Sequence, residues 1–176
     1  METAVCKEAG DCNLMKIISG GQIGADLAAL QFAESVGLET GGWMPKGFRN
    51  KNGENPDFGT RYGMIETHDI NYPARTRLNV MQSDLTLRFG HNFQTYGEKC
   101  TARYIREFKK PHLDVKISPA TFITLPDHLY VAEWLLVYRP EIVNVAGNSR
   151  PEIEGTVRYF LSRVWNIIKV YEQTAV

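Results

Sequence analysis

A glycine-rich segment near the N-terminus has the residue types and spacing of an anion-binding loop. Within Met15–Ala29, an apolar stretch runs into Ser19-Gly20-Gly21-Gln22-Ile23-Gly24, and a helical pattern follows at once. Glycines allow positive φ angles and close approach to a ligand, and the amides and dipole at a helix start favour phosphate or another oxyanion. The spacing is not the full dinucleotide fingerprint, so a plain turn between a strand and a helix is the alternative.

Four residues outside this loop are candidates for contacts with the same ligand. Asp26, in the first turn of the predicted helix, is either an acid that suits the helix dipole or a polar ligand contact. Trp43 is either a core aromatic or a ring that stacks on the ligand. Arg75 and Asn79 share one face of a later helix, where they either bind ligand or tie the preceding loop to the body.

The segment from Trp43 to Tyr62 is rich in Gly, Asn, Lys and Arg and has no periodicity. It is too long for an ordinary connection, and long loops in compact domains are usually functional or disordered. Its cations Lys46, Arg49 and Lys51 are either a solvated run or groups that neutralise an anion. Pro45 and Gly47 suggest a shaped loop, which keeps Lys46 as a ligand candidate.

The elements that must position these residues alternate between strand-like and helical runs. The predicted strands are Lys16–Ser19, Leu38–Gly41, Leu85–Phe89, His112–Ile117 and Ile142–Val145. After the first helix, which Gly37 ends, the predicted helices begin near Pro73, Thr95, Asp127 and Ser149. This alternation is typical of an α/β fold with a mainly parallel sheet of about five strands and helices on both faces.

Two helix starts carry the sequence of a capping box. Thr95 precedes Glu98 by three residues, and Ser149 precedes Glu152 by three residues, with Pro151 between them. Such pairs satisfy free amides in the first turn of a helix. We therefore expect helices to start at Thr95 and Ser149.

A flavodoxin-like strand order, 2-1-3-4-5, brings three glycine-bearing loops to one crevice. The loops Ser19–Gly24 and Gly90–Gly97 would flank the switch point, where open α/β sheets bind ligands. A third loop, Ala146-Gly147-Asn148-Ser149, ends the last strand on the same side. This convergence predicts a ligand site that includes Gly97, Gly147 and Asn148.

Composition limits the classes of function. The 176 residues fit one domain, predicted over residues 15–176, after a flexible extension at residues 1–14. Twenty acidic and twenty basic residues balance, which argues against a nucleic-acid partner, and no apolar run is long enough to cross a membrane. The first residues lack a secretory signal, and three cysteines and four histidines match no metal pattern. We expect a cytoplasmic protein without a metal site.

Four sequence blocks in order resemble the putative molybdenum carrier family. The blocks are Ser19-Gly20-Gly21-Gln22-x-Gly24-x-Asp26-x-Ala28-Ala29-Leu30, Gly41-Gly42-Trp43-x-Pro45-Lys46-Gly47, Arg75-Thr76-x-x-Asn79-Val80-x-x-Ser83-Asp84 and Asn144-Val145-Ala146-Gly147. The resemblance covers most of Met15–Tyr171. It implies a Rossmann-like three-layer sandwich, in the wider superfamily of the cytokinin-activating phosphoribohydrolases and sensors of nucleotide-derived ligands.

The resemblance also implies a cleft for a phosphorylated, ring-bearing ligand, with molybdenum cofactor (molybdopterin) as the named cargo. Carried onto matching positions, it implies that the first glycine loop holds the anion, that Lys46 and Arg49 neutralise it, and that Trp43 stacks on a ring. The chain departs from the family at Ile23 and Leu27, where members have Thr and Arg.

The second loop departs further from the family. Where a Gly-Gly-Thr-Ala-Leu-Thr type sequence is expected, the chain has Thr95-Tyr96-Gly97-Glu98-Lys99-Cys100-Thr101, which retains Gly97 and Thr101. Glu98 places a carboxylate at the helix start, where it suits the dipole but repels an anion. The ligand therefore differs from the family's usual one if this loop contacts it.

Three function classes remain open at this stage. The leading one is a binding or carrier protein for a phosphorylated heterocycle, since no nucleophile with a base is recognisable. The second is a hydrolase of N-glycosidic or phosphoribosyl bonds, with Glu98 or Glu66 as the catalytic carboxylate. The third is a sensor or scavenger of a nucleotide-derived signal. Exposed apolar residues on the last helix predict a homodimer or a higher homo-oligomer.

Overall fold

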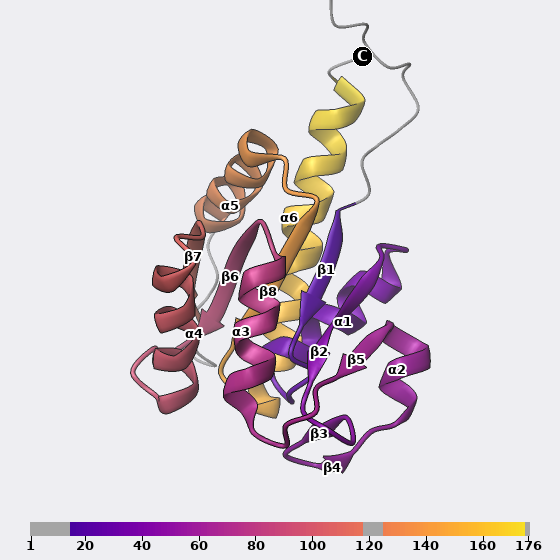
Figure 1. The fold of residues 1–176 in the computed structure, drawn as a ribbon. Helices are drawn as coiled ribbons and strands as arrows, with labels where there is room; N and C mark the ends of the chain where they lie inside the picture. The colour runs from indigo at the N-terminus through magenta and orange to yellow at the C-terminus, as the bar shows by residue number, and fades with distance from the viewer. Residues whose placement is uncertain (1–14, 118–124, 175–176) are drawn as a thin grey trace, which may run out of the picture.

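In the computed structural model, which describes residues 15–117 and 125–174, six parallel strands form one sheet in the order β5-β2-β1-β8-β6-β7 (Figure 1). They are β1 (Lys16–Ser19), β2 (Thr40–Met44), β5 (Met64–Glu66), β6 (Leu85–Gly90), β7 (His112–Lys116) and β8 (Ile142–Gly147). Ile17 of β1 lies opposite Val143 of β8, and Leu87 of β6 lies opposite Val145 of β8. The predicted extension at residues 1–14 lies outside the described residues.

The last strand of the chain lies in the middle of the sheet, so the predicted flavodoxin-like order was wrong. β8 pairs with β1 on one side and with β6 on the other, and β7 takes the edge. The physical reason is burial. Four consecutive residues of β8, from Val143 to Ala146, are buried, as in a strand covered on both faces, whereas only Val115 of β7 is buried.

The sheet has one more strand than predicted, and the segment before it is not a structureless loop. β3 (Arg49–Asn50) and β4 (Gly53–Glu54) form a short antiparallel hairpin, followed by α2 (Asp57–Tyr62) and the edge strand β5. These elements are two to six residues long, which is too short for a helical or strand periodicity to emerge in the sequence.

Helices cover both faces of the sheet. The longer ones are α1 (Ala25–Ser35), α3 (Tyr72–Gln82), α4 (Tyr96–Glu107), α5 (Leu125–Tyr138) and α6 (Glu154–Thr174). Buried residues of α1, α5 and α6 form the main core with β1, β6, β7 and β8. α3 and α4 pack together on the opposite face, around Val80, Tyr104 and Ile105. The result is the expected α/β sandwich of three layers.

The two predicted capping boxes differ in outcome. Thr95 is the N-cap of α4, and its hydroxyl accepts a hydrogen bond from the Glu98 amide at 3.4 Å. The Ser149 box was wrong, because the chain enters a 3-10 turn at Pro151–Ile153 whose N-cap is Arg150, without a side-chain cap. The Ser149 hydroxyl instead accepts a hydrogen bond from Lys51 Nζ at 2.6 Å.

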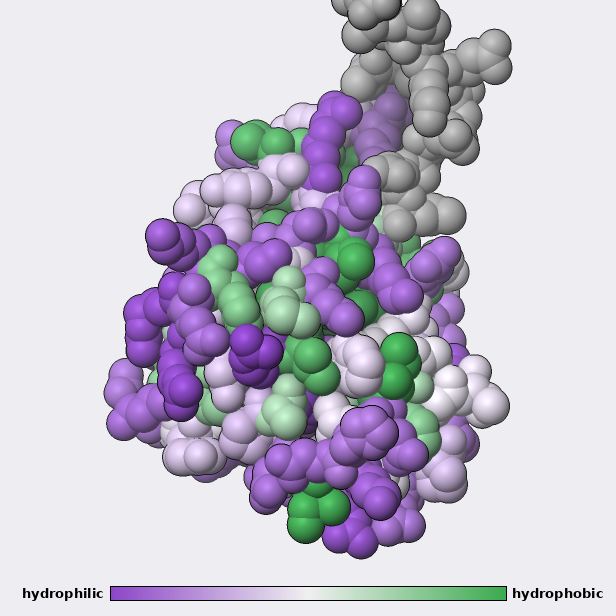
Figure 2. All heavy atoms as spheres, in the orientation of Figure 1, coloured by the Kyte–Doolittle hydropathy of each residue, from purple (hydrophilic) through white to green (hydrophobic). Residues whose placement is uncertain are grey.

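The face of the molecule seen in Figure 2 is mainly hydrophilic, with scattered apolar side chains. Large exposed apolar residues of α5 and α6 include Tyr130, Val137, Tyr138, Tyr159, Val170 and Tyr171. Association into a homodimer or a higher homo-oligomer stays a prediction. No helix in the described part of the chain combines the length and the apolar character needed to span a membrane.

Candidate functional site

A cavity of about 930 Å³ opens where β1, β8 and β6 end. The loops that follow these strands contribute Gln22, Ser149 and Asn92 to its wall, and α3 and α4 supply further side chains. The predicted convergence of three loops is therefore confirmed, although the strand order differs. The predicted site residues that line the cavity are Gln22, Asp26, Gly97, Glu98, Thr101, Gly147 and Asn148.

The backbone amides of the first glycine loop already have acceptors within the chain. The hydrogen bonds run from Gly21 N to Ser19 Oγ (3.1 Å), Gln22 N to Asp26 Oδ2 (3.4 Å), Ile23 N to Gln22 Oε1 (3.1 Å), Gly24 N to Glu154 Oε1 (2.8 Å) and Ala25 N to Asn148 O (3.2 Å). Two of these acceptors are carboxylates. The chain's own Asp26 and Glu154 thus occupy positions at which the amides of a phosphate loop would meet an anion.

Glycine is required in this loop because other parts of the chain come so close. A Cβ atom on Gly20 would lie 1.6 Å from Arg75 Nη1. Gly24 has φ 88°, and a Cβ there would lie 2.3 Å from the carbonyl oxygen of Asn148. These glycines therefore serve internal packing in the structure, as the plain-turn alternative predicts, and neither of them lines the cavity.

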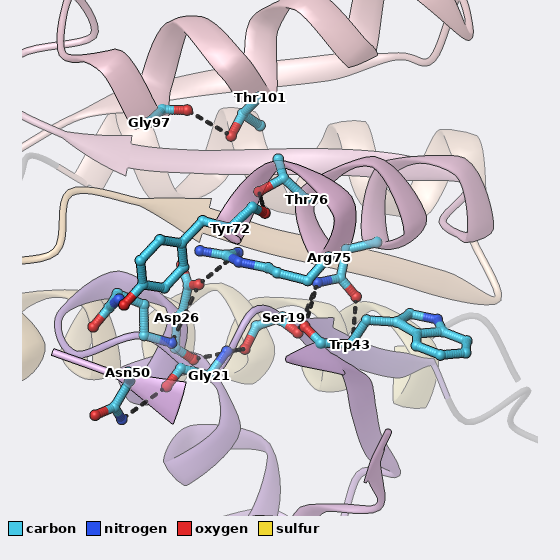
Figure 3. A network of polar contacts seen from close by, with 12 residues as sticks. Ser19, Gly21, Asp26, Trp43, Asn50, Tyr72, Arg75, Thr76, Gly97 and Thr101 are labelled. Atoms are coloured by element: carbon cyan, nitrogen blue, oxygen red, sulfur yellow. Dashed lines mark hydrogen bonds and ion pairs between the residues drawn. The ribbon is translucent and has the colours of Figure 1, made fainter. Parts of the chain in front are cut away.

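A buried ion pair between Asp26 and Arg75 joins α1 to α3 at the cavity wall (Figure 3). Arg75 Nη1 donates to Asp26 Oδ2 at 3.2 Å, and the Asp26 side chain is 3% exposed. Burial raises the pKa of the Asp26 carboxyl, and the Arg75 charge opposes that rise. The Nε atom of Arg75 is buried and has no hydrogen-bond partner, so this guanidinium retains a donor.

Asn148 ties the ends of β8 and β6 to the first turn of α4. Its Oδ1 accepts hydrogen bonds from the amides of His91 (3.1 Å) and Asn92 (3.4 Å). Its Nδ2 donates to the carbonyl of Asn92 (3.0 Å) and to Oε1 of Glu98 (2.9 Å). The side chain is fully engaged, and a Cβ on Gly90 would lie 2.8 Å from it. In this structure Asn148 positions the residues around it.

Glu98 is a buried carboxyl group with little charge compensation. Its side chain is 4% exposed, and Arg88 Nη1 lies 3.8 Å from its Oε2. The Arg88 guanidinium is committed to Asp114 through Nε (2.7 Å) and Nη2. Burial therefore outweighs the stabilising effects of Asn148 and Arg88 and raises the pKa of Glu98 from 4.5 to about 7. Its Oε2 has no hydrogen-bond partner.

Several predicted ligand residues, and the candidate catalytic residue Glu66, lie outside the cavity wall. The ligand residues are Ser19, Gly20, Gly21, Gly24, Trp43, Lys46 and Arg49. The indole of Trp43 donates to Gln82 Oε1 at 2.7 Å, well apart from Asp26 and Tyr72 in Figure 3. Lys46 is exposed. Arg49 pairs with Glu54 at 2.9 Å, and Glu66 accepts a hydrogen bond from the Gly47 amide at 2.7 Å.

Arg75 and Asn79 differ in their surroundings, and only Asn79 takes one of the two roles that their spacing left open. Asn79 ties the preceding segment to the sheet, since its Nδ2 donates to the carbonyls of Ser19 (3.0 Å) and Trp43 (3.1 Å). Its Oδ1 accepts from the Trp43 amide at 2.8 Å. Arg75, one turn earlier in α3, lines the cavity.

Sequence reasoning missed the cavity residues Tyr72, Tyr96, His91 and Arg150. Tyr72 and Tyr96 are 41% and 80% exposed, at the first residues of α3 and α4. A residue at the start of a helix that follows a sheet strand lies near the carboxyl edge of the sheet. Because the starts of both helices were predicted, the sequence did contain a signal for placing these two tyrosines near the cavity. The described residues hold no group of three His, Cys, Asp or Glu side chains placed to bind a metal ion.

Comparisons with known proteins agree with this architecture. Residues 17–165 match the model of the circularly permutated YpsA SLOG family. The chain is also similar to a crystal structure of a putative molybdenum carrier protein from Syntrophus aciditrophicus SB, with a TM-score of 0.75 and 32% identity over 86% of this chain and 95% of that chain. No curated protein has a matching sequence. The expected kinship with molybdenum carriers is confirmed, and the chain belongs to the circularly permutated YpsA SLOG family.

Proposed function

We propose that the protein binds a phosphorylated heterocyclic ligand, either molybdenum cofactor or a nucleotide-like molecule, as its carrier. The observation that carries this proposal is the cavity at the ends of β1, β8 and β6, whose wall retains unused hydrogen-bonding atoms. Arg75 Nε, His91 Nδ1 and Glu98 Oε2 are buried without a partner. Buried polar atoms are normally paired, so three orphans around one cavity support a ligand that completes them.

The size and lining of the cavity suit such a ligand. A volume of about 930 Å³ lies at the upper end of the range for small-molecule sites. Tyr72 and Tyr96 are exposed aromatic residues that can stack on a flat ring, the role that sequence reasoning gave to Trp43. Lys51 and Arg150 supply positive charge at the exposed rim of the cavity for a phosphate.

The molybdenum in a carried cofactor would arrive already held by the cofactor. The described part of the cavity wall offers one thiol, Cys100, and no cluster of metal ligands. Such a wall suits the pterin and phosphate of molybdenum cofactor better than a bare metal ion. The named relative from Syntrophus aciditrophicus SB supports a molybdenum-related cargo.

Native mass spectrometry of freshly purified protein, compared with the denatured chain, tests the proposal. We expect an adduct of several hundred daltons that denaturation releases, with the molybdenum isotope pattern or a nucleotide mass. A thermal-shift assay with guanosine and adenosine monophosphates and molybdopterin complements it, because a ligand that binds the folded state raises the melting temperature. A bare chain that none of these compounds stabilises would overturn the proposal.

The pKa of Glu98 favours a second candidate, hydrolysis of a nucleotide N-glycosidic bond. A carboxyl group with a pKa of about 7 can exchange a proton near neutral pH. In this reaction water adds to C1′ of the ribose, the C–N bond breaks, and the water proton passes through Glu98 to the departing base. Release of free base that is lost in Glu98→Gln and kept in Glu66→Gln would establish it, and no release from either monophosphate would exclude these substrates.

A further inference from the structure

The buried wall of the cavity carries two carboxyl groups and one paired cation, Arg75, and the exposed rim carries Lys51, Arg150 and Asp69. Asp26 and Glu98 are both 3% exposed, and they lie close enough for the Asp26 charge to raise the pKa of Glu98. Lys51 and Arg150, the cations contributed by the hairpin and by the loop after β8, are exposed. This distribution favours a ligand whose N–H groups meet the buried carboxyl groups and whose anionic end lies beside the exposed cations.

The glycine loop offers no vacant place for the anionic end. Its amides from Gly21 to Ala25 donate to acceptors within the chain, and Asp26 is one of these acceptors. A phosphate at this loop would have to displace the Asp26 carboxylate from Arg75 or lie beside it. Asp26 and Glu98 would repel a phosphate at the buried wall, so the exposed rim is the more favourable place for it.

One buried acceptor of the cavity wall, Oε2 of Glu98, instead lacks a hydrogen-bond donor. Glu98 lines the cavity, its Oε1 accepts from Asn148 Nδ2, and its Oε2 is without a partner. Arg88 cannot supply the missing donor, because its Nη1 lies 3.8 Å from Oε2 and hydrogen-bonds the Glu98 carbonyl at 3.2 Å. A carboxylate oxygen accepts two hydrogen bonds, so Oε1 also has capacity for a second donor.

We infer that Glu98 determines the specificity of the cavity by accepting hydrogen bonds from adjacent ring and exocyclic N–H groups of the heterocycle, while the phosphate lies at the exposed rim beside Lys51 and Arg150. This inference rests on the proposed binding function and deepens it. The adjacent N–H and NH2 groups of a 2-amino-4-oxopyrimidine ring, which guanine and pterin share, match a carboxylate in this way. Adenine offers one such donor beside an acceptor and fits less well.

Calorimetric titration of the full chain with three probes tests this orientation. Guanosine monophosphate carries both N–H groups, inosine monophosphate lacks the exocyclic amine, and guanosine lacks the phosphate. We expect guanosine monophosphate to bind about ten- to a hundredfold more tightly than inosine monophosphate, the usual effect of a hydrogen bond to a charged group. Glu98→Gln should remove most of this preference, and Glu107→Gln, on the exposed side of the same helix, should keep it.

The rim is tested separately with Lys51→Ala and Arg150→Ala. Each should weaken guanosine monophosphate binding about three- to tenfold and leave guanosine binding almost unchanged, because an exposed cation contributes modestly to an anion contact. Equal affinity for the guanosine and inosine monophosphates in the wild type would overturn the inference and leave the binding function standing. A folded Glu98→Gln variant that still prefers guanosine monophosphate over inosine monophosphate to the same degree would also overturn the inference and leave the binding function standing. Failure of every probe, together with a bare chain in native mass spectrometry, would overturn both.

Discussion

The side chain of Asn148 donates a 2.9 Å hydrogen bond to Oε1 of Glu98 and leaves the second oxygen of that carboxyl group without a partner. This contact replaces the second half of the capping box that the sequence predicts, in which Glu98 would reach back to Thr95. It holds a carboxyl group in the cavity wall. Its protonation state then affects both folding and binding.

Glu98 should lower the stability of the protein as the pH rises. Its pKa is raised from 4.5 to about 7 in the folded chain, so the unfolded chain loses this proton first. The contribution of Glu98 to the free energy of unfolding therefore falls between about pH 4.5 and pH 7, by roughly 3 kcal/mol in total. We expect urea denaturation of Glu98→Gln to show less of this decline. Equal pH profiles for the variant and the wild type would contradict the assignment, and Glu107→Gln is the matched control.

Binding of guanosine monophosphate should strengthen as the pH rises from 6 to 8. Two N–H donors prefer the ionised carboxylate, and Glu98 with a pKa of about 7 goes from mostly protonated to mostly ionised across this window. The groups that set this equilibrium are Arg88 and Asp114 on the neighbouring strands, Asp26 on α1, and the Asn148 amide. The expected gain is about tenfold. We expect no such gain in the same titration of Glu98→Gln, which serves as the correction for ionisation of the phosphate.

Removing one partner of the Asp26–Arg75 pair should have unequal effects. Asp26→Ala leaves the Arg75 cation buried without its counter-charge, and we expect a loss of about 3–5 kcal/mol in the free energy of unfolding. Arg75→Ala should cost less, because the pKa of Asp26 is already raised and the carboxyl can take up a proton. Arg77→Ala, on α3 like Arg75, removes an exposed pair with Glu107 of α4 and should cost under about 1 kcal/mol. Equal losses in the two buried variants at pH 7 would refute this order.

Two glycines of the expected binding loops should respond differently to alanine. A Cβ on Gly20 would displace the end of Arg75 and crowd Asp26 Oδ2 at 2.7 Å, so we expect Gly20→Ala to cost about 1–3 kcal/mol. Gly97 has nothing within 4 Å of such a Cβ and lies in the first turn of α4, where alanine is neutral or stabilises by up to about 1 kcal/mol. Thermal denaturation of both variants measures the contrast. Comparable melting temperatures for Gly20→Ala and Gly97→Ala would argue against close packing of Arg75 and Asp26 on Gly20.

Local signals predicted the elements of the fold well, and the expectation of a parallel sheet predicted which loops meet. Helix starts at Pro73 and Thr95 and the main apolar strands were correct to within a few residues, because each depends on nearby residues alone. The central place of β8 was missed, although β8 is mostly apolar, which favours that place, and β7 is mostly polar. The order of the strands depends on which strand must be covered on both faces. The difference in polarity between β8 and β7 indicates this better than the flavodoxin-like order does.

The direction of side chains in the site was harder to predict. Trp43 follows a strand and suits a stacking role in the sequence, yet its indole contacts the end of α3 through Gln82. The glycine loop has the composition of a phosphate cradle, and only the structure reveals that Asp26 and Glu154 accept its amides. Glu154 is 130 residues away from Gly24, and one sequence without an alignment contains no signal for such a distant partner.

The central position of β8 has a consequence for how the chain is made. Its neighbour β1 is complete by residue 19, and its other neighbour β6 by residue 90, but the strand that joins them ends at Gly147. Until that residue leaves the ribosome, β1 and β6 each present an unpaired edge, which invites pairing with other chains. The sheet therefore closes late in synthesis, through contacts of high sequence separation that slow folding. These two edges are therefore the places where a nascent chain is most prone to aggregate before its last strand emerges.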